Sequence, residues 1–131
     1  MLPEPRPNVV TQPYWHAVAR GVLQCPKCNV CGTRFFTPRF ACPSCLSEDW
    51  SWERSRGRGT ILSATTVHKA PFPGVATPYV LAVVTLDEGW YMLTNIVNCS
   101  PSEARIGAAV RVSFVHRGGE AVVPVFELEI A

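Results

Sequence analysis

The sequence predicts a mainly β protein in which a short N-terminal helix and a small metal-binding module precede a five-stranded barrel. Twelve prolines and nine glycines among 131 residues favour loops and strands over long helices. Five of the six cysteines fall between residues 25 and 45. Strand-like segments rich in β-branched residues follow residue 57. With 47% hydrophobic residues, the chain has enough apolar material for a core.

The segment 11–21 predicts a short helix. Thr11 suits the N-cap position, and Gly21 suits the end of the helix. Tyr14 and Trp15 belong to one apolar edge of this helix. Because two turns of helix are not stable alone, we expect Trp15 to dock either on the rest of the chain or on another protein. Both aromatic residues are therefore candidates for binding a ligand or partner.

Two C-x-x-C pairs predict a zinc ribbon. Cys28 and Cys31 form the first pair, Cys42 and Cys45 form the second, and ten residues separate the pairs. Four thiolates on two tight turns commonly hold one Zn²⁺. The insert between the pairs is long enough for a β-hairpin, which we expect at residues 32–41. Because cysteine fills all four positions, none is left open for water or substrate, and the site is expected to be structural.

Cys25 leaves the choice of ligands open, because Cys25 and Cys28 also form a C-x-x-C pair. Gly32 directly after Cys31 suits a backbone with positive φ and favours Cys28 and Cys31 as the first pair, with Cys25 spare. Two further interpretations are reduced cysteines without metal and a redox dithiol. No βαβ pattern surrounds either pair, which weighs against the dithiol.

Five strands with a helical turn between the third and fourth predict an OB-fold, a small closed Greek-key barrel. The strands are expected at residues 60–69, 79–86, 90–97, 109–117 and 121–130. Ser100, Pro101 and Glu103 form a capping box that opens the helical turn. We divide the chain into an N-terminal tail and helix (1–24), a zinc ribbon (25–56) and an OB-fold domain (57–131).

Five segments carry a resemblance to a known family: "PYWHAVARGVLQ", "CNVCGTRFFTPRFACPSC", "GRGTILSATTVH", "TPYVLAVVTLDEG" and "IGAAVRVSF". The chain resembles, over nearly its full length, a family first catalogued as a domain of unknown function. In that family a rubredoxin-like zinc ribbon precedes an acyl-CoA-associated OB-fold. This chain departs from the family pattern at Cys25, where a residue other than cysteine is expected.

The resemblance implies an accessory subunit of a thiolase-like enzyme. The partner would carry the catalytic residues for acyl-CoA condensation or for retro-aldol or retro-Claisen cleavage. Steroid side-chain degradation and aromatic catabolism are among the processes that the family implies. The implied assembly is a hetero-oligomer, with structural Zn²⁺ in this chain and a CoA thioester as ligand of the complex.

The sequence gives little indication of independent catalysis, and we predict no catalytic residue. His16, His68 and His116 have no carboxylate or serine at a recognised motif spacing. The sequence also lacks a glycine-rich phosphate loop, H-E-x-x-H and G-x-S-x-G. A scaffolding or substrate-presenting role therefore fits better than an independent enzyme.

The loop "APFPGVATPY" is the best candidate for contacting a ligand or partner, because it is apolar and proline-rich yet expected at the surface. The alternative is that it folds back over its own barrel. Phe72, Pro73 and Tyr79 come from this loop. Together with His68 just before it and Arg39 in the ribbon, they complete the set of candidate binding residues.

Charge distribution suggests an alternative function in binding single-stranded nucleic acid. Residues 20–58 carry seven basic and three acidic residues, although the whole chain has a net charge of only +2. A basic ribbon beside an OB-fold suits nucleic acid, CoA phosphates or an acidic partner. The isoelectric point near 8.3 makes nucleic acid the weaker choice. The sequence shows no signal peptide or long apolar stretch, so we expect a cytoplasmic protein without a membrane partner.

Overall fold

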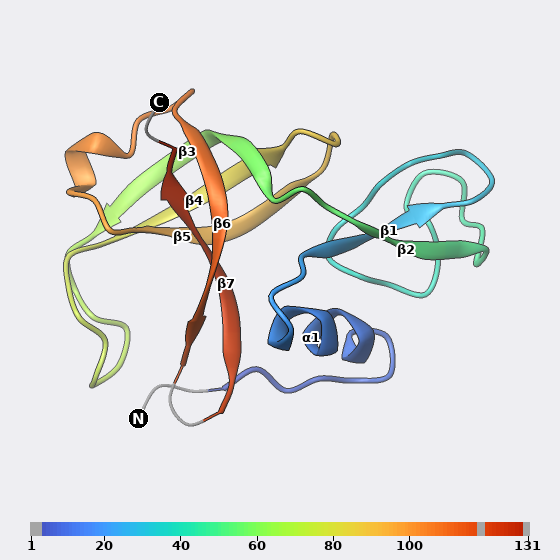
Figure 1. The fold of residues 1–131 in the computed structure, drawn as a ribbon, viewed down its shortest axis with the longest axis horizontal. Helices are drawn as coiled ribbons and strands as arrows, with labels where there is room; N and C mark the ends of the chain where they lie inside the picture. Colours follow the sequence, from blue (N-terminus) through green and yellow to red (C-terminus); the bar gives the residue numbers. More distant parts are fainter. Residues whose placement is uncertain (1–3, 118–119, 130–131) are drawn as a thin grey trace.

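The computed structural model of the chain describes residues 4–117 and 120–129, and it confirms a mainly β fold with a five-stranded closed barrel (Figure 1). The elements are α1 (Gln12–Ala19), β1 (Gln24–Cys28), β2 (Trp50–Arg54), β3 (Arg58–Val67), β4 (Tyr79–Leu86), β5 (Tyr91–Val97), the 3₁₀ helix η1 (Pro101–Glu103), β6 (Ala109–His116) and β7 (Val122–Leu128). The last predicted strand reached Ile130, which lies outside the described residues.

Helix α1 follows Thr11 and ends before Gly21, whose φ is +74°, as predicted. The Thr11 hydroxyl does not cap the helix. It accepts the Asn8 N–H at 2.9 Å instead, and the Thr11 N–H donates to Asn8 Oδ1 at 2.9 Å. Tyr14 and Val18 face the core. Neither α1 nor any other helix in residues 4–117 and 120–129 has the length and apolar run that a bilayer crossing needs.

The prediction of a β-hairpin inside the cysteine insert is wrong. The two-stranded sheet forms instead from β1 and β2, which lie before and after the insert and pair antiparallel (Figure 1). A single isolated bridge, between Lys27 and Arg34, reaches into the described residues of the insert. Pro38 lacks the N–H that a ladder at the centre of residues 32–41 would need. The segments that flank the insert pair with each other over five residues each instead.

The barrel closes in the order β3, β4, β5, β7, β6, with η1 between β5 and β6. The Ser100 N–H donates to Glu103 Oε1 at 2.9 Å, which confirms the capping box. The joint between β5 and β7 is short, because these parallel strands pair only at Ile96 with Phe126 and at Val97 with Glu127. Residues 91–95 of β5 and 122–125 of β7 are therefore not paired with each other.

An aromatic cluster joins the ribbon, the helix and the barrel in one core. The ring of Phe36, from the cysteine insert, lies 5.2 Å from that of Tyr14 and 5.3 Å from that of Trp90 (centroid to centroid). Trp52 of β2 lies 6.5 Å from Tyr14. Trp90 is fully buried. Because large aromatic side chains bury much apolar area, this contact contributes strongly to docking of the ribbon on the barrel.

The carboxylate of Glu88, in the turn between β4 and β5, accepts three hydrogen bonds beside this cluster. The Ser55 hydroxyl donates at 2.7 Å, the Arg56 N–H at 3.1 Å and the Trp90 Nε1–H at 3.3 Å. Arg34 from the ribbon also donates to the Glu88 carbonyl at 3.2 Å. These bonds fix the connection from β2 to β3 against the β4–β5 turn.

We predict that Glu88→Ala lowers the free energy of unfolding by about 3 kcal/mol, because hydrogen bonds to a charged group are strong and the substitution removes their acceptor. The hydroxyl of Ser55, which is only 7% exposed, would lose the acceptor of its proton. Urea denaturation measures the change. The matched control is Asp87→Ala, an exposed neighbour expected to change stability by less than about 0.5 kcal/mol. Equal losses in the two variants would contradict the prediction.

Candidate metal centre and binding cleft

Four cysteine sulfurs gather at the end of the ribbon. The Sγ atoms of Cys28, Cys31, Cys42 and Cys45 all lie within 4.8 Å of one another. Two of the separations are 3.5 Å, from Cys28 to Cys45, and 3.6 Å, from Cys31 to Cys42. Four sulfurs bound tetrahedrally at about 2.3 Å from one ion would lie about 3.8 Å apart. The cluster could therefore hold a metal ion, and it is compatible with a zinc ribbon.

Local backbone geometry turns the first cysteine pair toward the cluster. The N–H groups of Val30 and Cys31 donate to Cys28 Sγ at 3.4 Å and 3.5 Å. The bond from Cys31 contributes most to lowering the pKa of the Cys28 thiol, and so favours the thiolate that binds metals. Gly32 follows with φ +77°, the positive value that the sequence led us to expect.

Cys25 lies apart from the four-sulfur cluster. Its side chain is 1% exposed and packs in the main core with Tyr14 and Leu23. Burial, followed by the charge of Glu53, raises the pKa of the Cys25 thiol to about 12, so this group keeps its proton. The geometry therefore supports Cys28 and Cys31 as the first pair, although metal binding itself stays a prediction.

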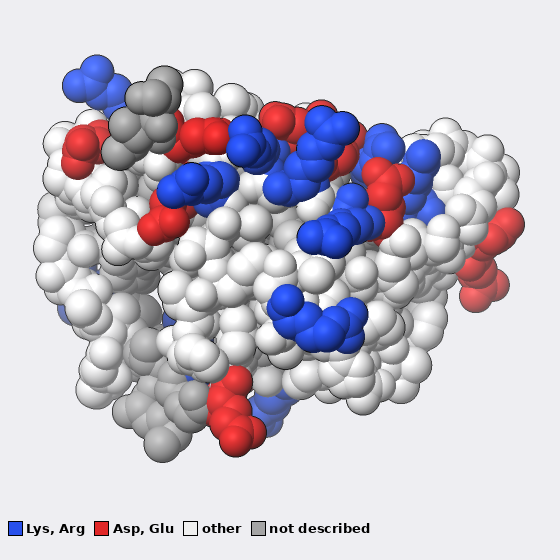
Figure 2. All heavy atoms as spheres, in the orientation of Figure 1, with Lys and Arg blue, Asp and Glu red and all other residues white. Residues whose placement is uncertain are grey.

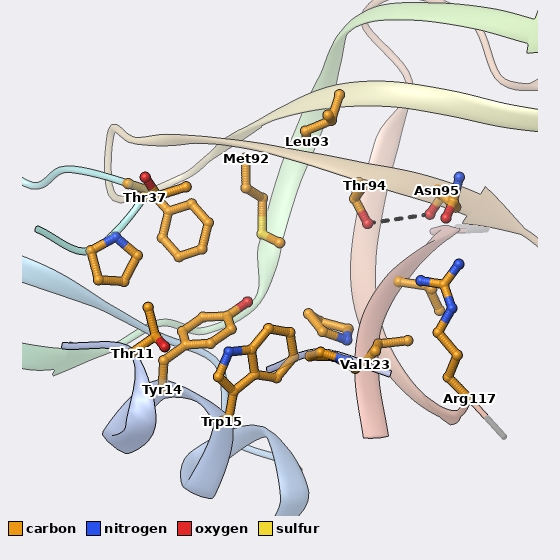
Figure 3. Close-up of a pocket in the computed structure, with 15 residues that line it drawn as sticks. Thr11, Tyr14, Trp15, Thr37, Met92, Leu93, Thr94, Asn95, Arg117 and Val123 are labelled. Carbon is orange, nitrogen blue, oxygen red and sulfur yellow. Dashed lines mark hydrogen bonds between the residues drawn. The ribbon is translucent and has the colours of Figure 1, made fainter. Parts of the chain in front are cut away.

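A cleft of about 330 Å³ lies where β5 and β7 separate (Figure 3). Aromatic rings of Tyr14 and Trp15 from α1 and of Phe36 from the ribbon line one side. Residues 92–95 of β5 and 123–125 of β7 line the other. The cleft is therefore built by all three parts of the chain.

A second cleft of about 390 Å³ adjoins the first and shares Asn95, Arg117 and Val125 with it. Phe72 and Tyr79, from the proline-rich loop, line this second cleft. The loop thus lies beside the ends of β5 and β7 and presents an apolar wall there.

The structure brings four of the predicted binding residues to these two clefts: Tyr14 and Trp15 in the first, Phe72 and Tyr79 in the second. Arg39, His68 and Pro73 are exposed and line neither cleft. Sequence reasoning missed several lining residues, among them Phe36, Thr94, Asn95 and Arg117. Only Thr94 gave a signal in the sequence, as a polar residue at an alternating inward position of a strand.

Acidic side chains lie among the basic residues that the sequence assigns to the ribbon, and they partly neutralise the positive charge there. Figure 2 shows Lys and Arg side chains gathered over one region of this face, with Asp and Glu interspersed. Arg34 and Lys27 pair with Glu53 at 2.8 Å and 3.6 Å, and Arg58 pairs with Glu129 at 2.9 Å. The hydrogen bond from Arg34 lowers the pKa of Glu53. Binding of nucleic acid stays an untested alternative.

The fold defines a class of protein with two modules. A four-cysteine ribbon, preceded by a short helix, is followed by an OB-fold barrel. A family model described as "ChsH2, C-terminal OB-fold domain" matches residues 52–115. A "DUF35 domain-containing scaffold protein" of Methanocaldococcus jannaschii is 33% identical over 112 residues, which cover 83% of this chain and 79% of the relative. The chain belongs to the DUF35 family.

Two further comparisons concern larger assemblies. A "Probable enoyl-CoA hydratase alpha subunit" of Thermomonospora curvata is 32% identical over 126 residues. These residues cover 96% of this chain but only 40% of that relative. A solved structure described as "Ltp2-ChsH2(DUF35) aldolase" contains a chain that is 31% identical, with a TM-score of 0.86. The match covers 95% of this chain and 98% of that chain.

We predict that the purified chain holds one tightly bound metal ion and that Cys42→Ser loses it. The ribbon should unfold in this variant, because the binding energy of such a site is also folding energy. Elemental analysis after dialysis measures the metal. Circular dichroism should still show the β-sheet signal of the barrel.

The matched control is Cys25→Ser, which should keep the metal at the level of the unmodified chain because Cys25 lies outside the cluster. Loss of metal in Cys25→Ser but not in Cys31→Ser would show that Cys25 and Cys28 form the first pair. Absence of metal from freshly purified protein would refute the metal site altogether.

Proposed function

We propose that this chain is a non-catalytic accessory subunit that assembles with a thiolase-like enzyme acting on acyl-CoA thioesters. The main support is the likeness to the DUF35 chain of the Ltp2-ChsH2 aldolase, which extends over 95% of this chain and 98% of that one. The relatives described as a scaffold protein and as a hydratase alpha subunit support the same kind of role. The reaction would be C–C bond condensation or retro-aldol or retro-Claisen cleavage, performed by residues of the partner.

We further propose that the bound metal is Zn²⁺ with a structural role. A site of four cysteine thiolates suits zinc and leaves no coordination position for substrate. The ion would hold the insert that carries Phe36, and Phe36 packs on Tyr14 and Trp90. Zinc would therefore keep the ribbon docked on the barrel, so that both modules face the partner in a fixed arrangement.

The CoA thioester is proposed as a ligand of the complex, approached by this chain through the second cleft. Phe72 and Tyr79 supply an apolar wall there, and Arg117 supplies a guanidinium group. An apolar wall beside one guanidinium group suits an amphipathic thioester. Steroid side-chain and aromatic acyl groups are the substrates that the family resemblance favours.

The expected result of co-expression with a thiolase-like protein from the same genome is co-elution of the two chains in size-exclusion chromatography. The partner should cleave or form C–C bonds in acyl-CoA substrates only when this chain is present, because the scaffold orders its active site. A matched sample with Cys42→Ser should co-elute poorly, since its ribbon would be unfolded.

If the two proteins elute separately and the partner works equally well alone, the proposed function is wrong. Titration with a fluorescent single-stranded oligonucleotide at low salt tests the alternative. Salt-dependent binding would support a nucleic-acid function, because phosphate contacts release counterions.

A further inference from the structure

The hydroxyl of Tyr14 points into the first cleft (Figure 3), although the residue as a whole is only 3% exposed. No hydrogen bond of this hydroxyl occurs within residues 4–117 and 120–129. Because every buried side-chain nitrogen or oxygen atom in these residues has a partner, the hydroxyl itself is open to the cleft. A hydroxyl group that opens onto a cleft is available to bond to water or to a ligand. Burial raises the pKa of Tyr14 above its ordinary value, so the group keeps its proton and can donate.

Thr94, on the β5 side of the cleft, carries a second hydroxyl, and the only hydrogen bond it donates among the described residues is a long one. It is 7% exposed, and its hydrogen bond to the carbonyl oxygen of Asn95 is 3.5 Å long (Figure 3). That distance lies at the outer limit for a hydrogen bond between a hydroxyl and an oxygen. Both hydroxyls line the same cleft.

The surroundings of these hydroxyls are apolar and aromatic. The Tyr14 and Trp15 rings meet edge to face at 5.0 Å, and Phe36 packs on Tyr14 at 5.2 Å. Met92 lies on the opposite wall, and Arg117 is the one cationic residue among the described lining residues. A phosphate group binds several donors or cations and would find too few here. The volume of about 330 Å³ is within the range of small-molecule pockets.

We propose that this cleft binds a rigid, ring-bearing hydrophobic molecule that carries an oxygen acceptor, with the hydroxyls of Tyr14 and Thr94 as donors to that oxygen. A rigid ring fills an aromatic cleft at little cost in conformational entropy. The identification of the ring as part of the acyl group of a thioester rests on the proposed function. On that basis this chain helps to select the acyl group, while the partner carries out the chemistry.

A matched pair of probes tests the role of Tyr14: 2-acetylnaphthalene, which carries a carbonyl oxygen, and 2-ethylnaphthalene, which has nearly the same shape without it. Equilibrium dialysis with the full metal-loaded chain measures both dissociation constants. Tyr14→Phe removes only the hydroxyl. It should weaken binding of the ketone roughly fivefold relative to the hydrocarbon, the value expected for one neutral hydrogen bond. Affinity for the hydrocarbon should stay unchanged.

Two further variants complete the experiment. Tyr91→Phe removes an exposed hydroxyl that does not line the cleft, and it should leave the ratio of the two affinities unchanged. Thr94→Val should shift this ratio in the same direction as Tyr14→Phe, and it provides the test if Tyr14→Phe does not fold. Circular dichroism checks folding.

The inference is overturned if neither probe binds, if the affinity ratio is unchanged in the folded cleft variants, or if Tyr91→Phe shifts it equally. None of these outcomes bears on co-elution with a thiolase-like partner, so failure of the cleft and failure of the proposed function are distinguishable.

Discussion

The carboxylate of Glu88 holds together parts of the chain that are far apart in sequence. It accepts hydrogen bonds from Ser55 and Arg56, in the connection between ribbon and barrel, and from Trp90, directly before β5. The ring of Phe36 packs on Trp90 at the same place. The first cleft depends on this contact, because one side of it is made by the helix and the ribbon and the other by barrel strands.

Aromatic contacts also connect the cysteine cluster to the cleft. Phe35 packs with Cys28 and Cys42 in the core of the ribbon and lies 5.8 Å from Trp50. Trp50 lies 5.4 Å from Trp52, and Trp52 in turn lies 6.5 Å from Tyr14. A metal ion that orders the ribbon would therefore also support the residues that line the cleft. This arrangement suits a scaffold whose two modules must keep a fixed orientation.

Local patterns in the sequence predicted much of this architecture. The positions of the barrel strands, the capping box at Ser100 and the two cysteine pairs depend on residues close together in the chain. Pairing of β1 with β2 could not be predicted in this way, because it joins segments on either side of a long insert. The clefts were missed for the same reason, since they form only where β5 and β7 diverge beside α1. The segment limits (1–24, 25–56 and 57–131) and the cytoplasmic location stay predictions.

Amide hydrogen exchange before and after removal of the metal by a chelator tests most directly whether the ion supports the contact between ribbon and barrel. The account predicts faster exchange in β1, β2 and the cysteine insert, and also in α1, which packs on the ribbon residues Phe36 and Trp52 through Tyr14. Strands β6 and β7, which pair along most of their length, should keep their protection. Unchanged exchange in the ribbon, or a loosened ribbon with no change in α1, would contradict the account.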